Sequence, residues 1–303
     1  MVRYLTYKEI DREKWDRCIA SSLLPLPCAL SWWLDIVSPN WEALVQDDYR
    51  AVMPLTQRRR YFIRYLVQPY FSQQLGIFSA DVTGESVTAE FLKHIPHKFR
   101  YIHIQLNSGN ICNTNGYRVK SRSNFILDLL PVYHDITTNY HRNCSRNIKI
   151  AKEAGLRTEE ITDTLVFLTF IQTQLKQELK NVKSHFYTCL KDLISTSFEN
   201  NSGKITGVYN NNQLLACAWH VLYKNRFNFL VCASTPVGRE NNAMYLLVDH
   251  LISQYAGSEI LFDFSGSDMP GVAYFNKGFG SIMQNYYSLY KNSLPWPINK
   301  IRR

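Results

Sequence analysis

Three strands in succession, joined by two tight turns, constrain the fold of this chain of 303 residues more than any other feature. The segment GKITGVYNNNQLLACAWHVLYKNRFNFLVCAS, residues 203–234, contains three runs rich in apolar residues. Asparagines separate the first two runs at residues 210–212, and a Lys-Asn pair separates the last two at residues 224–225. Asparagine tolerates the left-handed backbone of a tight turn, so the segment predicts an antiparallel meander.

A helix and a glycine-rich segment follow the meander. The sequence NNAMYLLVDHLISQYAG predicts a helix that Asn241 or Asn242 caps and that Gly257 ends. The expected core face of this helix consists of Ala243, Leu246, Leu247 and Ile252. A strand over residues 259–264 then leads into a segment with four glycines, and a last strand is expected over residues 283–290.

The rest of the chain alternates between helices and strands. In the first half we expect helices over residues 11–21, 30–36 and 87–94, a hairpin around residues 46–48 and a strand over residues 101–107. In the second half we expect a strand near Asn124, a basic helix that ends at Gly155, and helices over residues 164–180 and 186–198. The two halves follow related orders. This predicts an α+β chain of two domains, 1–123 and 124–303, each with a largely antiparallel mixed sheet flanked by helices.

Composition excludes several classes of protein. Apolar residues make up 46% of the chain, enough for a packed core. No apolar run approaches the roughly 20 residues of a membrane span, so a membrane role would be peripheral. The seven cysteines form no CxxC and no Cys/His spacing that suits zinc, so we expect reduced thiols, no metal and a cytoplasmic protein. The net charge of +9 favours anionic ligands, although a soluble protein from a basic proteome has the same charge.

The loop between the meander and the next helix is a candidate anion site. Free backbone N–H groups and the positive end of a helix dipole suit a phosphate at such a place. The candidate residues are Val237, Gly238, Arg239, Asn241, Asn242 and Ala243. An ordinary strand-to-helix loop gives the same pattern, and neither a Walker loop nor a Rossmann fingerprint is present.

Basic residues recur along the helix in HRNCSRNIKIAKEAG, residues 141–155. They are spaced by three or four residues and therefore line one stripe of the helix: Arg142, Arg146, Lys149 and Lys152. The stripe is either a solvated face or an anion-binding surface. In the second case Arg142 and Arg146 are candidate substrate contacts.

Two further segments hold candidate substrate contacts. The glycine-rich segment places Lys277 close to Tyr274 and Phe275, where a partly desolvated ammonium stabilises negative charge. A tight turn with an outward lysine is the alternative. The segment QPYFSQQLG offers neutral hydrogen-bonding groups beside aromatic rings, and packing explains these equally well: Gln68, Tyr70 and Gln73.

Together these motifs resemble the FemABX-like branch of the GNAT acyltransferase superfamily. The likeness spans about residues 124–290, and its most specific pieces are RNI from Arg146, Asp263 with Gly266, and KGFG from Lys277. The resemblance implies two GNAT-like domains in tandem. It also implies N-acyl transfer from a thioester or an aminoacyl-tRNA ester to an amine of a small molecule, a sugar or a cell-wall precursor.

The resemblance also assigns roles to residues. It puts the donor phosphates at residues 237–243, where Gly238 stands alone in place of the usual two glycines. The family lysine carries over to Lys277, which is expected to stabilise the tetrahedral oxyanion or the leaving group, and Asp263 is the candidate base. Amides of the last meander strand, residues 230–233, are expected oxyanion donors. No nucleophile motif is present, and direct attack by an amine needs none.

Three functions stay open at this point. The first is an N-acyltransferase with acyl-CoA as the donor. The second is a binding protein that kept the fold and lost the donor site, which the single Gly238 and the asparagine before Lys277 favour. The third is an aminoacyl-tRNA-dependent transferase, which the charge favours, although the sequence holds no heptad-bearing helical arm.

Overall fold

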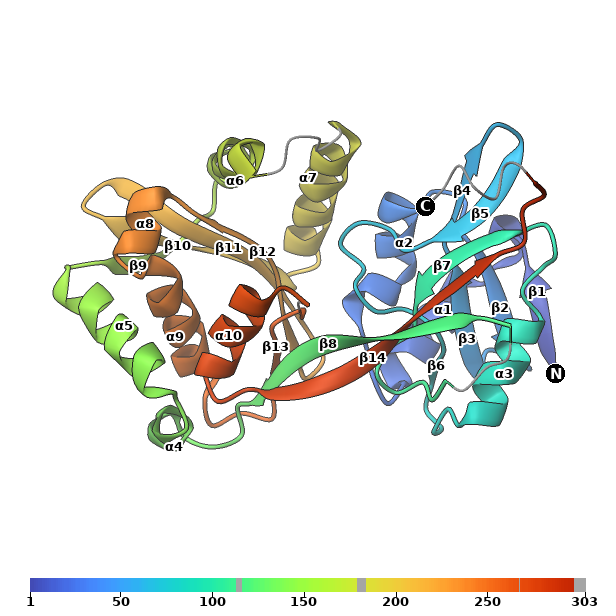
Figure 1. The fold of residues 1–303 in the computed structure, drawn as a ribbon, viewed down its shortest axis with the longest axis horizontal. Helices are drawn as coiled ribbons and strands as arrows, with labels where there is room; N and C mark the ends of the chain where they lie inside the picture. Colours follow the sequence, from blue (N-terminus) through green and yellow to red (C-terminus); the bar gives the residue numbers. More distant parts are fainter. Residues whose placement is uncertain (113–115, 179–183, 267, 297–303) are drawn as a thin grey trace. The chain divides into compact units, whose positions relative to one another are not determined.

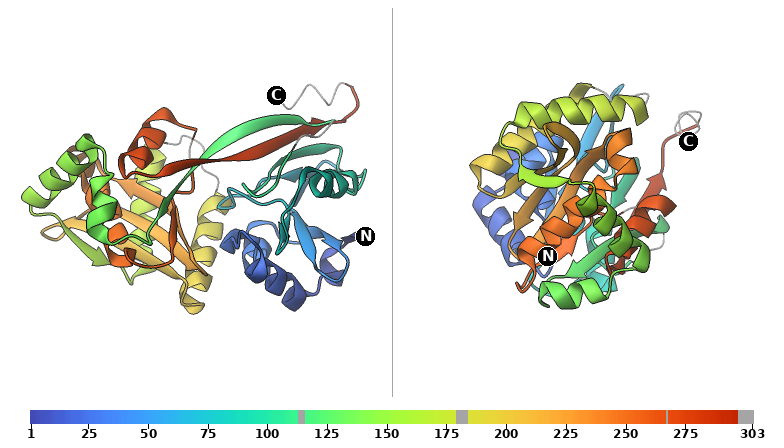
Figure 2. Two further views of the ribbon diagram at one scale, coloured as in Figure 1. Left: turned by 90° about the horizontal axis from the view of Figure 1, so that it is seen from below. Right: turned by 90° about the vertical axis from the view of Figure 1, so that its left-hand side faces the viewer.

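The computed structural model describes residues 1–112, 116–178, 184–266 and 268–296, except for the side chains of residues 176–178 (Figure 1). The chain divides into two compact units: unit 1 is residues 1–122 with the chain from Asn285 on, and unit 2 is Ser123–Gln284. Two long strands, β8 (Arg118–Asp128) and β14 (Ile282–Asn292), contribute residues to both units and are neighbours in the sheet order (Figure 2). Most of the last strand of the segment predicted as a second domain, from Asn285 on, thus belongs to unit 1.

Unit 1 contains two groups of paired strands. An antiparallel sheet has the order β1-β2-β3-β6, and a second group has the order β4-β5-β7-β14. The elements are β1 (Val2–Leu5), α1 (Arg12–Ser21), α2 (Ser31–Val37), β2 (Glu42–Gln46), β3 (Ala51–Leu55), β4 (Gln57–Arg60), β5 (Ile63–Val67), β6 (Phe78–Ser79), α3 (Glu85–Lys93) and β7 (Tyr101–Gln105). They confirm the three predicted helices, the hairpin and the strand of the first half.

Tryptophan side chains fill the core of unit 1. Trp15 and Trp41 are fully buried with ring centroids 4.6 Å apart, and the indole N–H of Trp15 donates to the carbonyl oxygen of Ala29 at 2.8 Å. The helix α1 begins where the side chain of Asp11 accepts a hydrogen bond from the N–H of Lys14. Burial of Trp15 together with its cap therefore fixes the helix against β3 and β6.

Unit 2 is built on a sheet with the order β8-β13-β12-β11-β10-β9. Its elements are α4 (Tyr133–Thr138), α5 (Arg142–Glu153), β9 (Arg157–Glu160), α6 (Thr164–Glu178), α7 (Ser184–Glu199), β10 (Gly203–Asn210), β11 (Gln213–Tyr223), β12 (Arg226–Ser234), α8 (Pro236–Glu240), α9 (Ala243–Tyr255), β13 (Leu261–Asp263) and α10 (Pro270–Gly278). The predicted meander is β10, β11 and β12, all antiparallel. Its turns have positive φ at Asn211 (49°) and Lys224 (54°). The strands mix parallel and antiparallel pairs, which confirms the predicted α+β class.

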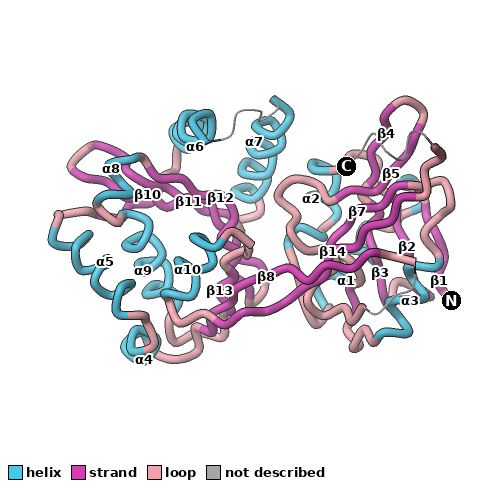
Figure 3. The backbone as a smooth tube through the Cα atoms, viewed as in Figure 1, coloured by secondary structure: helices cyan, strands magenta, loops and turns pink. Residues whose placement is uncertain are grey.

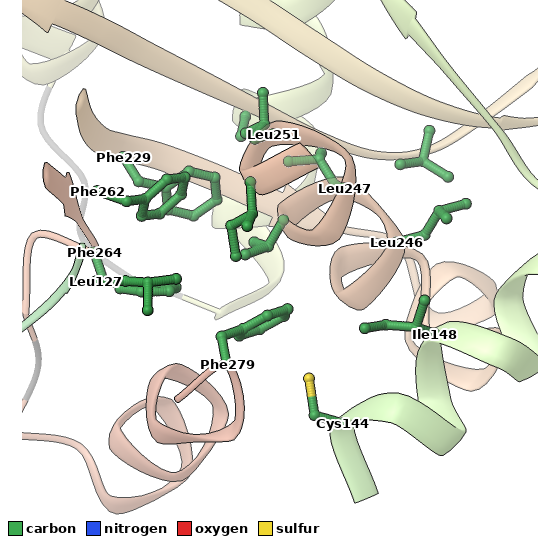
Figure 4. Close-up of a cluster of buried hydrophobic side chains, with 14 of the residues drawn as sticks. Leu127, Cys144, Ile148, Phe229, Leu246, Leu247, Leu251, Phe262, Phe264 and Phe279 are labelled. Carbon is green, nitrogen blue, oxygen red and sulfur yellow. The ribbon is translucent and has the colours of Figure 1, made fainter. Parts of the chain in front are cut away.

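Helices cover both faces of the unit 2 sheet. Figures 1 and 3 show α5, α9 and α10 on one face and α6 with α7 on the other. The main core lies under α9, where Leu246, Leu247 and Phe279 pack with sheet residues (Figure 4). The glycines predicted to end α5 and α9 follow each helix with positive φ, Gly155 at 72° and Gly257 at 80°. The predicted helix over residues 164–180 is present to Glu178, and its last two residues lie outside the described residues.

Two segments that look like loops in the sequence are short helices. α8 begins with Pro236, and the side chain of Thr235 caps it by accepting from the N–H of Gly238. α10 also begins at a proline, Pro270, and spans the segment that we expected to be an irregular, glycine-rich connection. Gly278 ends α10, and a Cβ there would lie 3.4 Å from the Cβ of Cys144 on α5, which is an ordinary van der Waals contact.

Candidate functional site

The sheet of unit 2 opens between its two parallel neighbours, β12 and β13. Residues 226–228 of β12 pair with residues 261–263 of β13, and β12 then continues to Ser234. A register shift against β11 leaves Leu230 as a bulge, two residues after Asn228, the last residue of β12 that pairs with β13. Beyond Asp263 the chain turns through Ser265 and Gly266, both with positive φ. Within the described residues, β12 therefore extends past the end of β13 along an open edge.

Backbone amides of β12 face this open edge. The N–H of Thr235 donates to the carbonyl oxygen of Leu215, which fixes the phase of the hydrogen bonds between β11 and β12. Because bonded pairs alternate along an antiparallel ladder, the amides of Ala233 and Val231 point toward β11. Those of Cys232 and Ser234 point away from β11. Among residues 230–233, where we expected oxyanion donors, Cys232 thus has its amide directed away from β11.

The predicted donor-phosphate segment is a helical turn whose polar groups bond within it. The N–H of Gly238 donates to Oγ1 of Thr235 at 2.9 Å, and the guanidinium of Arg239 donates to the carbonyl oxygen of Ser234 at 2.9 Å. Asn241 donates to the carbonyl oxygen of Val237 at 2.9 Å. A Cβ at Gly238 would lie 2.4 Å from the carbonyl oxygen of Leu215, so this glycine is needed for packing on β11.

The start of α9 completes this segment. Asn242 occupies the N-cap position with φ 58°, and its side chain makes no capping bond. Ala243 is fully buried and belongs to the core. The predicted residues therefore do lie together, at the end of β12, with the side chain of Arg239 exposed.

The helix α10 presents Lys277 at its last turn. Lys277 is exposed, and its ammonium lies 5.8 Å from the ring centroid of Phe125 on β8. Tyr274 is 57% exposed, whereas the ring of Phe275 packs 4.7 Å from that of Tyr245. Lys277 and Tyr274 are therefore available to a ligand, and Phe275 belongs to the packing of α10.

Asp263 is held in a buried ion pair. Its Oδ2 lies 2.8 Å from Nε and 2.7 Å from Nη2 of Arg226, and its Oδ1 accepts from the N–H of Ser265 at 2.8 Å. Both side chains are 3–4% exposed. Both carboxylate oxygens are engaged, so this geometry fits a structural role better than that of a base. The role of Asp263 as a base stays a prediction.

A second polar cluster lies under α9, and the sequence motifs did not point to it. The carboxylate of Asp249 accepts from the hydroxyl of Tyr133 at 2.6 Å, from that of Tyr140 at 3.3 Å and from the ammonium of Lys152 at 3.1 Å. These groups border a cavity of about 580 Å³ between α4, α5 and α9. Burial and the neighbouring carboxylate raise the pKa of both tyrosines. Burial raises the pKa of the nearby Cys144 thiol to about 12, so this thiol is unreactive.

The basic stripe of α5 serves two purposes. Cys144, Ile148 and Ala151 of the same helix face the core. Arg142 and Arg146 are exposed, and Arg146 donates to the side chain of Asn143 at 2.6 Å. Lys149 and Lys152 line the cavity beside Asp249, and Lys152 also donates to the Asp249 carboxylate.

The remaining candidates belong to unit 1. Gln68 accepts from the N–H of Gln105 at 2.9 Å and donates to the carbonyl oxygen of Ser72, so it holds a loop against β7. The guanidinium of Arg58 lies 5.5 Å from the ring of Tyr70, and Gln73 is half-buried. These three residues belong to unit 1, whereas the other candidate residues belong to unit 2.

Metal binding and membrane insertion can be judged from side-chain geometry and helix length. No group of three or more His, Cys, Asp or Glu side chains in the described ranges is arranged to hold a metal ion. None of the helices in that part of the chain has the length and apolarity needed to cross a membrane.

Comparisons with known proteins give likeness in structure alone. No family model and no curated protein sequence matches the chain. The crystal structure of FemX is similar over 99% of both chains, with a TM-score of 0.68 and 11% identity. A tandem GNAT protein from the clavulanic acid biosynthesis pathway covers 97% of this chain and 99% of its own, with a TM-score of 0.56 and 10% identity. L-PGS from Bacillus licheniformis covers 96% of this chain and 95% of its own, with a TM-score of 0.54 and 11% identity. The resemblance drawn from the sequence is confirmed at the level of fold: the chain has a FemX-like tandem GNAT fold.

Proposed function

We propose that the chain is an N-acyltransferase that moves an acyl group from a thioester or ester to an amine. The observation that carries the proposal is the opening between β12 and β13, with strand amides of β12 directed into it. A carbonyl group placed along such an edge finds hydrogen-bond donors where negative charge develops during acyl transfer. The fold shared with a tandem GNAT protein and FemX supports the same chemistry.

The reaction needs no protein nucleophile. The amine lone pair attacks the carbonyl carbon, a C–N bond forms, and the oxygen becomes an oxyanion held by the β12 amides. The C–S or C–O bond to the leaving group then breaks, and the leaving group takes up the proton that the amine loses. In this proposal Lys277 lies at the exposed end of α10 and stabilises the oxyanion or the leaving group. Asp263 keeps Arg226 and Ser265 in place beside the opening.

Acyl-CoA is the first candidate donor. Arg239 is exposed next to the end of β12 and offers a positive charge to a phosphate there. The similar tandem GNAT structure is specified as the form without AcCoA, which connects that protein with a donor of this type. The acceptor is then an amine of a small molecule, a sugar or a cell-wall precursor.

An aminoacyl-tRNA ester is the second candidate donor, and one observation favours it. The amides of Gly238, Arg239, Asn241 and Asn242 all bond within the α8 turn, so they are not directed at a pyrophosphate. A donor whose phosphates bind elsewhere avoids this difficulty. The net charge of +9 fits a nucleic acid partner as well.

A thermal-shift series tests the proposal and separates the donors. The purified protein is heated with CoA, acetyl-CoA, longer acyl-CoAs and a non-hydrolysable aminoacyl-adenosine. A ligand at a hundred times its dissociation constant adds about 2.7 kcal/mol to the free energy of unfolding, which raises the melting temperature. A shift with acyl-CoA supports the first donor and a shift with the adenosine analogue supports the second. No shift with either contradicts catalysis and favours a binding protein of the same fold.

A further inference from the structure

The turn between β4 and β5 carries two exposed aromatic side chains. Tyr61 is 78% exposed and Phe62 is 92% exposed. Both have positive φ, 46° and 62°, and Arg60 pairs with Ile63 across them. A two-residue turn with this backbone is of type I′, which asparagine and glycine adopt far more readily than aromatic residues. Formation of the hairpin therefore does not explain why aromatic residues occupy its tip.

Arginines surround these aromatic residues. The sequence RRRYFIR covers residues 58–64, and no aspartate or glutamate occurs between Arg50 and Asp81. The guanidinium of Arg59 lies 5.6 Å from the ring centroid of Phe62, and that of Arg60 lies 5.2 Å from that of Tyr61. The tip is therefore apolar and cationic at once.

A basic cavity of about 460 Å³ lies beside the tip. Four cations and four apolar side chains line it: Arg59, Arg64, Lys98, Arg100, Phe62, Ile63, Leu294 and Pro295. One carboxylate, that of Glu42, faces two of these cations, with Oε1 at 3.4 Å from Arg64 and Oε2 at 2.8 Å from Lys98. The cations thus outnumber the acid by three. Trp296, two residues beyond Leu294, is 75% exposed.

We propose that the lipid-docking surface, which consists of the β4–β5 hairpin and residues 294–296, binds unit 1 to an anionic phospholipid bilayer. Tyrosine and tryptophan favour the boundary between lipid headgroups and acyl chains, and a phenylalanine at the tip enters that boundary. Arginines at the same depth attract anionic headgroups, and the cavity takes a lipid phosphate. This inference goes beyond the proposed acyl transfer and does not depend on it.

Single-stranded RNA is the competing partner for a surface of arginines and rings. RNA binds such surfaces by stacking its bases on open ring faces. Here the guanidinium groups of Arg59 and Arg60 lie over one face of Phe62 and of Tyr61, so only the other face of each ring is open to a base. The most exposed side chain of the tip, Phe62, is wholly apolar, and this favours the bilayer.

Vesicle flotation tests the lipid-docking surface. The full chain is mixed with phosphatidylcholine vesicles, or with vesicles that also contain about one third phosphatidylglycerol. The decisive variant is Tyr61→Asn/Phe62→Gly, because it removes the aromatic rings and supplies the residues that a type I′ turn prefers. We expect roughly tenfold weaker partitioning or more from the loss of buried aromatic surface, with a melting temperature at least equal to that of the wild type.

A second variant and a matched control separate local charge from total charge. Arg59→Gln/Arg60→Gln is expected to weaken partitioning about 25-fold, since each arginine near the surface contributes about fivefold. The control Arg3→Gln/Arg17→Gln removes two exposed arginines elsewhere in unit 1 and leaves binding unchanged. The wild type is expected to bind the anionic vesicles and to release them as salt is raised.

Three results would overturn the proposal. The first is a wild type that does not float with the anionic vesicles. The second is a Tyr61→Asn/Phe62→Gly variant that floats as well as the wild type. The third is a fluorescent single-stranded RNA that binds the hairpin while the vesicles do not, which identifies a nucleic acid surface instead.

Discussion

Two buried aspartates of unit 2, Asp263 and Asp249, have contrasting surroundings. Asp263 and its partner Arg226 are both 3–4% exposed, and the sheet encloses the pair. Asp249 is equally buried, but the side chain of its partner Lys152 is 55% exposed and the cluster borders a cavity of about 580 Å³. The sequence motifs singled out the first carboxylate and missed the second. Asp263, which lies in the family-like motif, is thus enclosed with its partner in the sheet. Asp249, which lies in an apolar helix, borders a cavity instead.

Removal of Asp263 is expected to have the largest effect. Asp263→Ala leaves the guanidinium of Arg226 buried without its partner, which lowers the free energy of unfolding by about 3–5 kcal/mol. Urea unfolding measures this loss. The double variant Arg226→Met/Asp263→Leu replaces the pair with apolar groups and should recover most of the stability, to within about 1 kcal/mol of the wild type. A loss below about 1 kcal/mol in the single variant would show that the pair does not hold the sheet.

Removal of Asp249 is expected to cost less, although it has more partners. In Asp249→Leu the ammonium of Lys152 turns to solvent, and the two tyrosine hydroxyls meet water in the cavity. We therefore expect a loss of about 2 kcal/mol, within the range for unsatisfied polar groups. The same urea titration measures it. A loss as large as that of Asp263→Ala would remove the contrast between the two regions.

His220 extends the comparison to a buried base. Burial lowers the pKa of His220 to about 3, with smaller effects from Lys204 and His250. The unfolded chain takes up this proton below about pH 6.5, and the folded chain does so only near pH 3, so stability falls as the pH drops between these values. The slope is at most about 1.4 kcal/mol per pH unit.

Two glutamine variants isolate this slope. His220→Gln retains a hydrogen-bonding group for Oγ1 of Thr206, which lies 3.1 Å from Nε2 of the histidine, and should flatten the decline below pH 6.5. His134→Gln, at an exposed position, should leave it unchanged. The free energy of unfolding is measured at pH 5 and pH 7 for the wild type and both variants. If His220→Gln loses as much stability between these pH values as the wild type does, other groups cause the decline.

Lys277 is expected to have the smallest effect on stability and a large effect on turnover. Its side chain is exposed, so Lys277→Ala should change the free energy of unfolding by about 0.5 kcal/mol or less. If it stabilises the oxyanion or leaving group, turnover falls about 100-fold. Lys152→Ala, beside Asp249, should leave turnover unchanged. Equal turnover of wild type and Lys277→Ala would remove this lysine from the mechanism.

Local patterns were sufficient to predict most elements of the fold. The meander follows from its apolar runs and turn asparagines, and α9 follows from its apolar face and terminal glycine. The sequence predicts loops at α8 and α10, because each begins with proline and contains glycine. Packing against Leu215 explains Gly238 of α8, and no local pattern reveals that contact. The parallel strands β12 and β13 are separated in the chain by α8 and α9, and no local pattern specifies where their pairing stops.

The candidate site was predictable only where its residues are neighbours in sequence. Residues 237–243 lie together as expected, because they are consecutive. Asp249 meets Tyr133, Tyr140 and Lys152 from 116, 109 and 97 residues away, and sequence spacing carries no information at that range. The one signal in the sequence was a charged residue inside the apolar run YLLVDHLI. A carboxylate at a core position needs partners, and that requirement predicts a buried polar cluster.

The most direct test of the central claim is hydrogen exchange with and without a donor. The protein is incubated in deuterated buffer with acetyl-CoA, or with the aminoacyl-adenosine analogue if that ligand gives the thermal shift. The account predicts slower exchange in the peptide that covers residues 229–234 of β12, where amides face the opening, and in the peptide that carries Lys277. Protection confined to α5 and the Asp249 side of α9 would contradict it and would move the ligand site to the cavity.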